Sequence, residues 1–487
     1  MKTVSFYTLG CKLNYAETAS LERQFVDHGF SVTSFDQPSD VCVINTCSVT
    51  ERANRECRQI VRRALRTSPD ACVIVLGCYA QLEPEQIASI DGVDIVLGAS
   101  EKFHVFSYAG DFTKQPAPKI FVPSIDEAKD FGIAYSGGVD DRTRAFLKVQ
   151  DGCDFSCSFC TIPLARGKSR SQSIEACVQQ AHKLQEMGYK EIVLTGVNVG
   201  DYGKHDGNSL LMLLQALESV EGIERIRVSS IEPNLLTPSL LGYWLASEKI
   251  CKHFHIPLQS GSDAQLKAMR RRYTTSSYAN LIHTIKDKNP DAGIGADVIV
   301  GFPGETNEIF EQEYNFLHVL PVSYLHVFTY SERANTPSVE FEGRVEPRIR
   351  YRRSEMLRTL GHKKKHAFYE TQIGRSLDVL VENHASGMAE GTSEDNMCRT
   401  CDGVVDDFTA SRSAGFSGYT DNYVRVQVPY HPAQGAMAPQ ALTSLENSFV
   451  RVRLVHVTSD ACVGEVEQAC AVPVSIPYLP LVPSLVE

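Results

Sequence analysis

The sequence predicts an α/β protein in three parts: an N-terminal parallel α/β domain, a central partial (βα)6 barrel and a small C-terminal β-barrel. Short apolar strands alternate with helical patterns over residues 1–107 and again over 144–370, which is typical of parallel sheets. From 371 to 455 the pattern changes to short strands in which polar and apolar residues alternate, which is typical of a small β-barrel.

The N-terminal domain, residues 1–107, is predicted from short apolar runs that are rich in β-branched residues. Strands are expected at 3–9, 30–35, 41–46, 72–77 and 93–97. Helices are expected at 15–28, 50–66 and 84–89. The next segment, 108–143, contains Pro116, Pro118 and Pro123, and this composition predicts a linker.

The central domain, residues 144–370, is predicted from a second run of alternating strands and helices. Strands are expected at 145–149, 190–195, 225–230, 253–258, 294–300 and 325–330. Helical patterns lie between them, for example at 173–187, 209–219 and 306–318. Six βα units without a seventh predict an open barrel, whose active site lies at the carboxyl ends of the strands.

The C-terminal domain is predicted from strands at 377–382, 423–428 and 449–454. The long stretch 385–418 is small and polar, so we expect a flexible loop there. Its Cys398 and Cys401 form an isolated C-x2-C pair, which is a weak metal-site signal. The tail 456–487 shows no pattern that indicates a role.

Composition narrows the class of protein. The chain has 487 residues and a net charge of −11, which does not favour a generally basic nucleic-acid binder. We expect no membrane span, since no apolar stretch is long enough, and no signal peptide. Fifteen cysteines without a secretory signal predict a cytoplasmic protein whose thiols bind metal rather than form disulfides.

Three local basic clusters stand out from this acidic average. Arg55, Arg58, Arg62 and Arg66 share one face of an expected helix, and 270–272 is a run of three arginines. Residues 344–366 hold nine Lys or Arg against two Glu. Each cluster alone is more typical of a solvated helix face, but three together favour a phosphate-bearing partner.

The most specific motif is the C-x3-C-x2-C spacing of Cys153, Cys157 and Cys160. Three thiolates on one short loop can hold three irons of a [4Fe–4S] cluster, which leaves the fourth iron open for a small molecule. A structural zinc site is the weaker alternative, because zinc prefers four protein ligands and no fourth Cys or His lies nearby.

Three further cysteines, Cys11, Cys47 and Cys78, each follow an expected strand of the N-terminal domain. Because ligands collect at the carboxyl ends of parallel strands, we expect the three to converge on one site. The alternative is that they are buried core residues, which cysteines often are. Cys42, Cys57 and Cys72 lie within apolar or helical patterns, and we interpret those as packing residues.

These motifs together resemble the methylthiotransferases of the radical S-adenosylmethionine (SAM) superfamily. The resemblance extends to about residue 455, where 418–423 is similar to part of the TRAM RNA-binding domain. It implies that Cys153, Cys157 and Cys160 bind a [4Fe–4S] cluster whose open iron holds SAM. It also implies that Cys11, Cys47 and Cys78 bind a second [4Fe–4S] cluster. The insertion 385–418 and the tail after 456 depart from the family pattern.

The resemblance also implies a reaction and a substrate. In the family, one electron cleaves SAM to a 5′-deoxyadenosyl radical, which removes a hydrogen from adenine C2 before sulfur is inserted. The opening segment 8–18 is most similar to members that modify N6-threonylcarbamoyladenosine at position 37 of tRNA. The implied partners are the anticodon stem-loop of tRNA, a sulfur donor and an electron donor such as flavodoxin or ferredoxin. No membrane partner is expected.

Polar and apolar residues at the strand ends complete the expected site, although half of them could simply cap the next helix. No catalytic side chain is assigned. The expected SAM contacts are Phe159, Gly196, Asn198, Ser229, Glu232, Gln259, Asp297 and Ile299. Arg425, Arg451 and Arg453 alternate on expected strands of the C-terminal barrel, and we expect them to bind RNA phosphates.

Other functions remain open at this point. One alternative is a methylthiotransferase for isopentenyladenosine 37 or for a ribosomal-protein side chain. Arginine-lined strands in the C-terminal barrel favour RNA over a protein target. A different class is a non-enzymatic, RNA-binding iron–sulfur protein. An electron carrier protects its clusters with full cysteine ligation, whereas this chain supplies three cysteines at each site.

Overall fold

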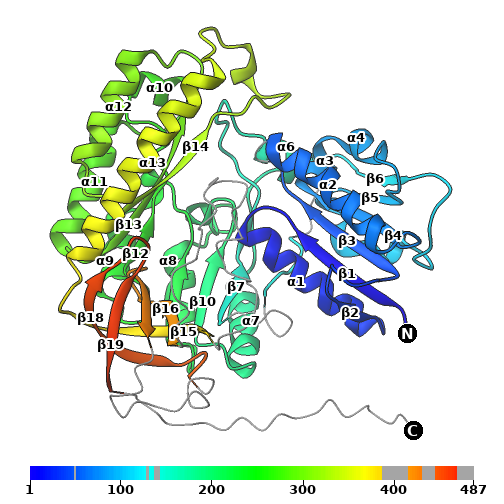
Figure 1. The fold of residues 1–487 in the computed structure, drawn as a ribbon, viewed down its shortest axis with the longest axis horizontal. Coiled ribbons are helices and arrows are strands. Elements are labelled where there is room, and N and C mark those ends of the chain that lie inside the picture. Colours follow the sequence, from blue (N-terminus) through cyan, green and yellow to red (C-terminus); the bar gives the residue numbers. More distant parts are fainter. Residues whose placement is uncertain (49–50, 128–130, 137–142, 386–414, 430–444, 469–487) are drawn as a thin grey trace.

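The computed structural model describes residues 1–48, 51–127, 131–136, 143–385, 415–429 and 445–468. Figure 1 shows the N-terminal domain in blue beside the central barrel in green and yellow, with the C-terminal barrel in orange and red. The structure differs from the sequence-based expectation at the linker 108–143, at the loop 385–418 and at the end of the C-terminal barrel. No described helix has the length and apolarity that crossing a membrane requires.

The N-terminal domain is a six-stranded parallel sheet in the order β2-β1-β3-β4-β5-β6. Its strands are β1 (Thr3–Thr8), β2 (Ser31–Thr33), β3 (Val41–Thr46), β4 (Cys72–Gly77), β5 (Ile95–Leu97) and β6 (Lys119–Phe121). Its helices are α1 (Lys12–Asp27), α2 (Glu51–Thr67), α3 (Cys78–Leu82), α4 (Pro84–Ala88) and α5 (Val105–Tyr108).

Strand β6 corrects the linker expected at 108–143, because it pairs with β5 as the last strand of this sheet. It is only three residues long and partly exposed, so it carries no apolar run that a sequence pattern would detect. The central strands β3 and β4 are fully buried along their whole length. Cys42, Cys57 and Cys72 are buried in the cores on the two faces of the sheet, as expected for packing residues.

The central domain is an open barrel of six parallel strands. They are β7 (Arg144–Lys148), β10 (Glu191–Thr195), β11 (Arg225–Val228), β12 (His253–His255), β13 (Gly293–Val300) and β14 (Tyr324–Thr329). The sheets β11-β10-β7 and β12-β13-β14 are joined by the parallel bridges Ile226–Ile250 and Ser230–His255. The structure thus has the partial (βα)6 barrel that the sequence predicts.

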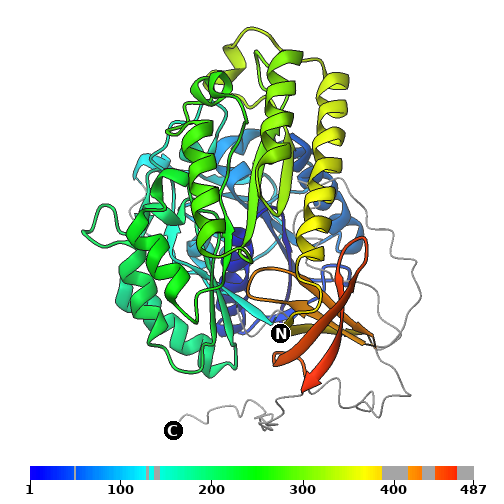
Figure 2. The same cartoon turned by 90° about the vertical axis from the view of Figure 1, so that its left-hand side faces the viewer.

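Helices cover the outer side of these strands (Figure 2). The longer ones are α7 (Ile174–Glu186), α8 (Leu210–Glu218), α9 (Pro238–Ala246), α11 (Thr275–Lys288), α12 (Asn307–Val319) and α13 (Pro347–Glu370). Five of the six follow a Ser or Thr whose side chain accepts a backbone N–H of the first turn, which is the preferred N-cap arrangement. Short elements near the cysteine loop are β8 (Gln150–Asp151), α6 (Ile162–Arg166), β9 (Arg170–Ser171) and α10 (Asp263–Ala268).

The C-terminal domain is a closed five-stranded barrel in the order β15-β16-β17-β19-β18. Its strands are β15 (Ser376–Ala385), β16 (Gly415–Tyr419), β17 (Arg425–Pro429), β18 (Phe449–Val457) and β19 (Cys462–Gln468). The end of the expected loop 385–418 therefore belongs to β16, and the barrel continues past residue 455. Glycines in β16 and acidic residues in β19 conceal both strands in the sequence. Cys398, Cys401 and residues 469–487 lie outside the described residues.

This barrel docks on the amino ends of the central strands, at the edge opposite the cysteine loop. Arg227 donates to the carbonyl oxygens of Thr420 and Asp421 at 3.1 and 3.0 Å, and Tyr423 stacks on His253 with ring centroids 4.4 Å apart. The segment 418–423 therefore helps attach the C-terminal barrel to the central barrel.

Candidate active site

The cysteines of the N-terminal domain lie together at one edge of its sheet. Strands β1, β3 and β4 are adjacent and parallel. Cys47 and Cys78 directly follow the carboxyl ends of β3 and β4, and Cys11 lies shortly after the end of β1. Gly10 has φ +108°, and a Cβ there would lie 2.9 Å from the Cys47 Sγ. The backbone before Cys11 therefore contacts Cys47, and no larger residue fits.

Asn14, a buried residue of α1, holds two of these cysteine loops in place. Its Nδ2 donates to the carbonyl oxygens of Leu9 at 2.7 Å and Thr46 at 3.1 Å. Its Oδ1 lies 3.9 Å from the Cys11 Sγ. Cys11 is exposed, whereas Cys47 and Cys78 are buried, so a ligand held by all three thiols would be reachable from one side.

The second group, Cys153, Cys157 and Cys160, lies on the loop between β8 and α6 and is partly exposed. Gly152, with φ +72°, precedes it, and a Cβ there would lie 2.0 Å from the Lys168 carbonyl oxygen. Burial and neighbouring thiols raise the pKa of Cys160 to about 12. Ionising such a thiol in isolation is unfavourable, but coordination to an iron cation stabilises the thiolate.

Arg271 connects this cysteine loop to Glu232, one of the expected SAM contacts. Its Nη1 donates to the Cys157 Sγ at 3.0 Å, its Nη2 to the Glu232 carboxylate, and its Nε to the Tyr273 hydroxyl at 3.0 Å. The side chain of Arg271 is buried, whereas its neighbours Arg270 and Arg272 are exposed. The run 270–272 is therefore not a uniform basic surface, since its middle residue belongs to the site.

Orphaned polar atoms gather at the carboxyl ends of β10 and β11. Within the described residues, Thr195 Oγ1, Asn198 Oδ1 and Ser229 Oγ are buried without a hydrogen-bond partner. Such atoms normally have partners in a folded protein, so they fit a polar ligand at this edge. Gly196 also lies at this edge, and it packs closely, since a Cβ there would meet Gln150 at 2.9–3.0 Å.

The remaining expected contacts lie on β13 and beside it. Ile299 and Phe159 belong to one apolar cluster with Phe302, so the structure brings these two predicted residues together. Gln259 has φ +72° and its backbone pairs with β13, donating to the Asp297 carbonyl oxygen at 2.8 Å.

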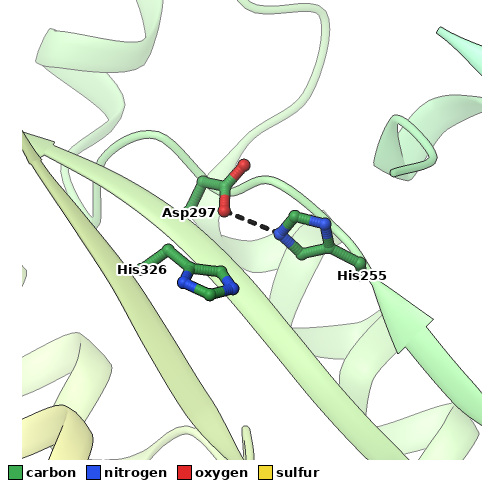
Figure 3. A group of neighbouring side chains, drawn as sticks. All are labelled: His255, Asp297 and His326. Atoms are coloured by element: carbon green, nitrogen blue, oxygen red, sulfur yellow. Dashed lines mark hydrogen bonds and ion pairs between the residues drawn. The ribbon is translucent and has the colours of Figure 1, made fainter. Parts of the chain in front are cut away.

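Asp297 lies in a polar group with His255 and His326 (Figure 3). The sequence patterns singled out Asp297 but neither of the two histidines. His255 Nε2 is 2.6 Å from Asp297 Oδ1, and His255 Nδ1 is 2.8 Å from the Ser230 hydroxyl. One ligand atom from each of the three residues lies within 4.8 Å of the others. Burial opposes ionisation of Asp297, but His255 and His326 hold its pKa below the usual value. Both nitrogens of His255 already have hydrogen-bond partners, so His255 could bind a metal only if one of these hydrogen bonds were broken.

A buried charge network joins the two cysteine groups. Glu17 of α1 forms ion pairs with Lys102 at 2.5 Å, Lys148 at 3.2 Å and Arg166 at 2.9 Å. Arg166 also contacts Asp151 at 3.0 Å. Burial alone would raise the pKa of Glu17, but Arg166, Lys102 and Lys148 hold it well below its usual range. Removing one member of such a network costs about 3–5 kcal/mol, because the partner charges stay buried.

The basic clusters have different surroundings. Arg55, Arg58, Arg62 and Arg66 are all exposed on α2. Within the cluster 344–366, Arg350 and Arg353 are buried and paired with Glu332 and Glu305, both at 2.6 Å. That cluster is therefore partly structural rather than a continuous phosphate-binding face.

The C-terminal barrel presents mixed charge rather than the arginine-lined face expected from its sequence. Arg451 and Arg453 are exposed on β18, and Arg425 is half-buried on β17. Arg451 is paired with Asp378 at 2.9 Å, and Arg453 stands opposite Glu465 in the register of β18 and β19. The alternation along β18 places the arginines on the outer face, and neighbouring strands place acidic residues beside them.

Two family models match the chain. One, described as "Uncharacterized protein family UPF0004", matches residues 3–98, and the other, "Radical SAM superfamily", matches residues 147–317. The radical SAM methyltransferase TsrM from Kitasatospora setae has a similar fold, with a TM-score of 0.50 over 67% of this chain and 73% of that chain at 13% identity.

Several curated relatives are similar over most of their length. "Threonylcarbamoyladenosine tRNA methylthiotransferase MtaB" of Bacillus subtilis (strain 168) is 39% identical over 88% of this chain and 90% of its own. The protein of the same name from Aquifex aeolicus (strain VF5) is 40% identical over 80% of this chain and 97% of its own. "tRNA-2-methylthio-N(6)-dimethylallyladenosine synthase" of Acetivibrio thermocellus is 31% identical over 77% of this chain and 79% of its own.

The open barrel with its three-cysteine loop defines a radical SAM enzyme, and membership of that superfamily implies SAM and a [4Fe–4S] cluster as cofactors. The chain belongs to the methylthiotransferase family of these enzymes, which transfer methylthio groups. The resemblance inferred from the cysteine spacing is thereby confirmed.

Proposed function

We propose that this enzyme adds a methylthio group to C2 of N6-threonylcarbamoyladenosine at position 37 of tRNA. The names of the relatives that are 39% and 40% identical support this substrate. The observation that carries the chemistry is the pairing of two three-cysteine sites. Arg166, from the helix after Cys160, contacts the Cys78 Sγ at 3.2 Å, so the two sites lie on the same buried network.

The proposal assigns one [4Fe–4S] cluster to each cysteine group. Cys153, Cys157 and Cys160 hold the SAM cluster, and Cys11, Cys47 and Cys78 hold the auxiliary cluster. When bound, SAM and its cluster supply a carbon radical that can remove the hydrogen from adenine C2, a bond that no side-chain base can open. The chain's own residues hold the two sites in fixed relation and orient the substrate.

The predicted SAM contacts stay part of this proposal. The orphaned oxygens of Asn198 and Ser229 suit the amino and hydroxyl groups of SAM. Arg271 fixes the carboxylate of Glu232 beside the cysteine loop, while Phe159 and Ile299 offer an apolar surface for the adenine. Gly196, Gln259 and Asp297 complete the proposed set of SAM contacts.

The partners are proposed on chemical grounds. A tRNA substrate presents phosphates to the exposed arginines of α2, the helix that follows Cys47, and to Arg425, Arg451 and Arg453. The reaction also requires a one-electron donor, such as flavodoxin or ferredoxin, and a sulfur donor. A tRNA substrate and thiolate ligands that need reducing conditions support the predicted cytoplasmic location.

Nucleoside mass spectrometry tests the substrate. Deleting the gene in its host is expected to remove the 2-methylthio form of N6-threonylcarbamoyladenosine from tRNA and to leave the unmodified nucleoside in its place. Re-expressing the wild-type chain should restore the 2-methylthio nucleoside, and expressing a Cys11→Ala chain should not. Loss of the 2-methylthio form of an isopentenyladenosine instead would reject the proposed nucleoside while keeping the class of enzyme.

The arginine face of α2 provides a test of tRNA binding. Replacing Arg55, Arg58, Arg62 and Arg66 by alanine is expected to weaken binding. The slope of log affinity against log[salt] should become shallower, by up to about 0.9 for each phosphate that is no longer neutralised. Binding is measured by fluorescence anisotropy at several salt concentrations. We expect a smaller effect when Arg425, Arg451 and Arg453 are replaced, because acids face two of them.

Arg63→Ala is the matched control for this test, since Arg63 lies on the same helix but is paired with Asp36. It should leave affinity and salt dependence nearly unchanged. If the fourfold variant binds tRNA like the wild type at every salt concentration, the α2 face is not an RNA surface.

A further inference from the structure

Each of the two cysteine sites has one arginine that donates a hydrogen bond to one of its thiol sulfurs. Arg166 Nε lies 3.2 Å from the Cys78 Sγ, and Arg271 Nη1 lies 3.0 Å from the Cys157 Sγ. Both guanidinium groups are buried, with 2% and 3% of their side chains exposed. A buried arginine keeps its charge, so both contacts add a fixed positive charge as well as a donor.

Arg166 reaches across the interface between the two domains. It ends α6, which begins two residues after Cys160, yet its sulfur contact is to Cys78 at the start of α3. The same guanidinium contacts Asp151, which is two residues before Cys153, at 3.0 Å. A residue of the SAM-cluster loop therefore contacts a thiol of the auxiliary site.

The other donors of Arg166 have their own acceptors. Nη1 donates to Glu17 at 2.9 Å and to Asp151, and Nη2 donates to Asn14 at 2.6 Å and to Glu17 at 3.1 Å. Two carboxylates and an amide thus orient the guanidinium so that Nε faces the sulfur. An arginine needed only for the ion pairs would not have to contact the sulfur.

The charge balance around Cys78 fits an anionic group. The fully buried members of the network are three cations, Lys102, Lys148 and Arg166, and two carboxylates, Glu17 and Asp151. One positive charge is therefore in excess beside Cys78, and an unpaired buried charge is costly. A [4Fe–4S] cluster held by three thiolates is anionic in its common oxidation states, and it would compensate this excess.

We propose that Arg166 is a positioning residue that sets the reduction potential of the auxiliary cluster, and that Arg271 has the same role at the SAM cluster. The inference rests on the proposed function, since it requires a cluster at each site. Hydrogen bonds to cluster sulfurs and nearby positive charge stabilise the reduced, more negative cluster and raise its potential. One arginine per site sets the two potentials independently, and thereby which cluster a common electron donor reduces first.

A crossed pair of variants tests this assignment by potentiometric titration followed by electron paramagnetic resonance. Each cluster is measured alone, the auxiliary cluster in a Cys153/Cys157/Cys160→Ala background and the SAM cluster in a Cys11/Cys47/Cys78→Ala background. Arg166→Gln is expected to lower the potential of the auxiliary cluster only. Arg271→Gln is expected to lower that of the SAM cluster only. We expect at least a tenfold change in the ratio of reduced to oxidised cluster, about 59 mV for one electron.

Two control variants distinguish the effect of the arginine–sulfur contact from the effect of removing a nearby charge and from a loss of folding. Lys102→Met removes a cation of the same network that contacts Glu17 rather than a thiol, so it should shift the auxiliary potential less than Arg166→Gln. Arg166→Lys keeps the charge and should restore part of the potential, which also covers the case in which Arg166→Gln does not fold. Equal shifts at both clusters, no shift, or an equal effect of Lys102→Met would overturn the inference.

The proposed function fails in a different way. If the chain with Cys153, Cys157 and Cys160 replaced holds no iron and shows no cluster signal, there is no auxiliary cluster and the two-cluster proposal is wrong. If that signal is present but Arg166→Gln and Arg166→Lys leave its potential unchanged, only the role of Arg166 is wrong.

Discussion

Replacing Cys153, Cys157 and Cys160 together by alanine is expected to abolish reductive cleavage of SAM and to remove one of the two proposed clusters. The three thiols lie on one loop between β8 and α6, and we propose that they are the protein ligands of the SAM cluster. Without them SAM has no iron to bind, so no carbon radical forms. The measurement is 5′-deoxyadenosine release by mass spectrometry, with iron content determined after anaerobic reconstitution.

The control for this prediction is a cysteine of the same barrel that lies away from the loop. Cys177 on α7 is fully buried in the core, so Cys177→Ala should cost only about 1 kcal/mol of stability and should keep SAM cleavage. Release of 5′-deoxyadenosine by the triple variant at the wild-type rate would show that the radical site is elsewhere.

The strands were predictable where they are buried and apolar. The expected strands at 41–46 and 72–77 coincide with β3 and β4, because fully buried parallel strands appear as unbroken apolar runs. Strands β6, β16 and β19 were missed. They are short, or rich in glycine, or acidic on the exposed side, and they form because neighbouring strands offer hydrogen bonds rather than because of their own residues.

The two cysteine groups could be recognised from the sequence, because they are marked by spacing and by their place after strands. Their role as cluster ligands stays a prediction. Arg166 and Arg271 were missed because their importance depends on contacts distant in sequence. Arg166 contacts a sulfur 88 residues away, and Arg271 contacts one 114 residues away. The pattern of three arginines at 270–272 indicated a charged surface, whereas packing separates the middle residue from the other two. Only a fold that places α6 against α3 reveals Arg166.

Charge patterns predicted the surfaces less well than spacing predicted the cysteines. The cluster at 344–366 indicated a basic face, yet the barrel pairs Arg350 and Arg353 with carboxylates from other elements. The arginines of β18 are similarly matched by Asp378 and Glu465. A sequence window counts charges along one element, while the electrostatic potential depends on what the neighbouring elements bring.

The N-terminal cysteines are expected to separate the two halves of the reaction. Cys11→Ala, Cys47→Ala and Cys78→Ala should each stop formation of the methylthiolated nucleoside while SAM cleavage continues, because the radical site is in the other domain. The measurement compares 5′-deoxyadenosine with methylthiolated product in the same reaction mixture. Cys11→Ala is the cleanest of the three variants, since Cys11 is exposed and its replacement leaves no cavity in the core.

Cys42→Ala and Cys72→Ala are the matched controls, because both residues are buried within strands of the same sheet. They should keep both products, with only a modest decrease in stability. The distinction depends on position, since the proposed ligand cysteines lie just beyond the carboxyl ends of the strands and the controls lie within the strands. If the controls stop methylthiolation as completely as Cys11→Ala does, the sheet edge is not a cluster site. In that case the cysteines of this sheet serve only to stabilise the N-terminal domain.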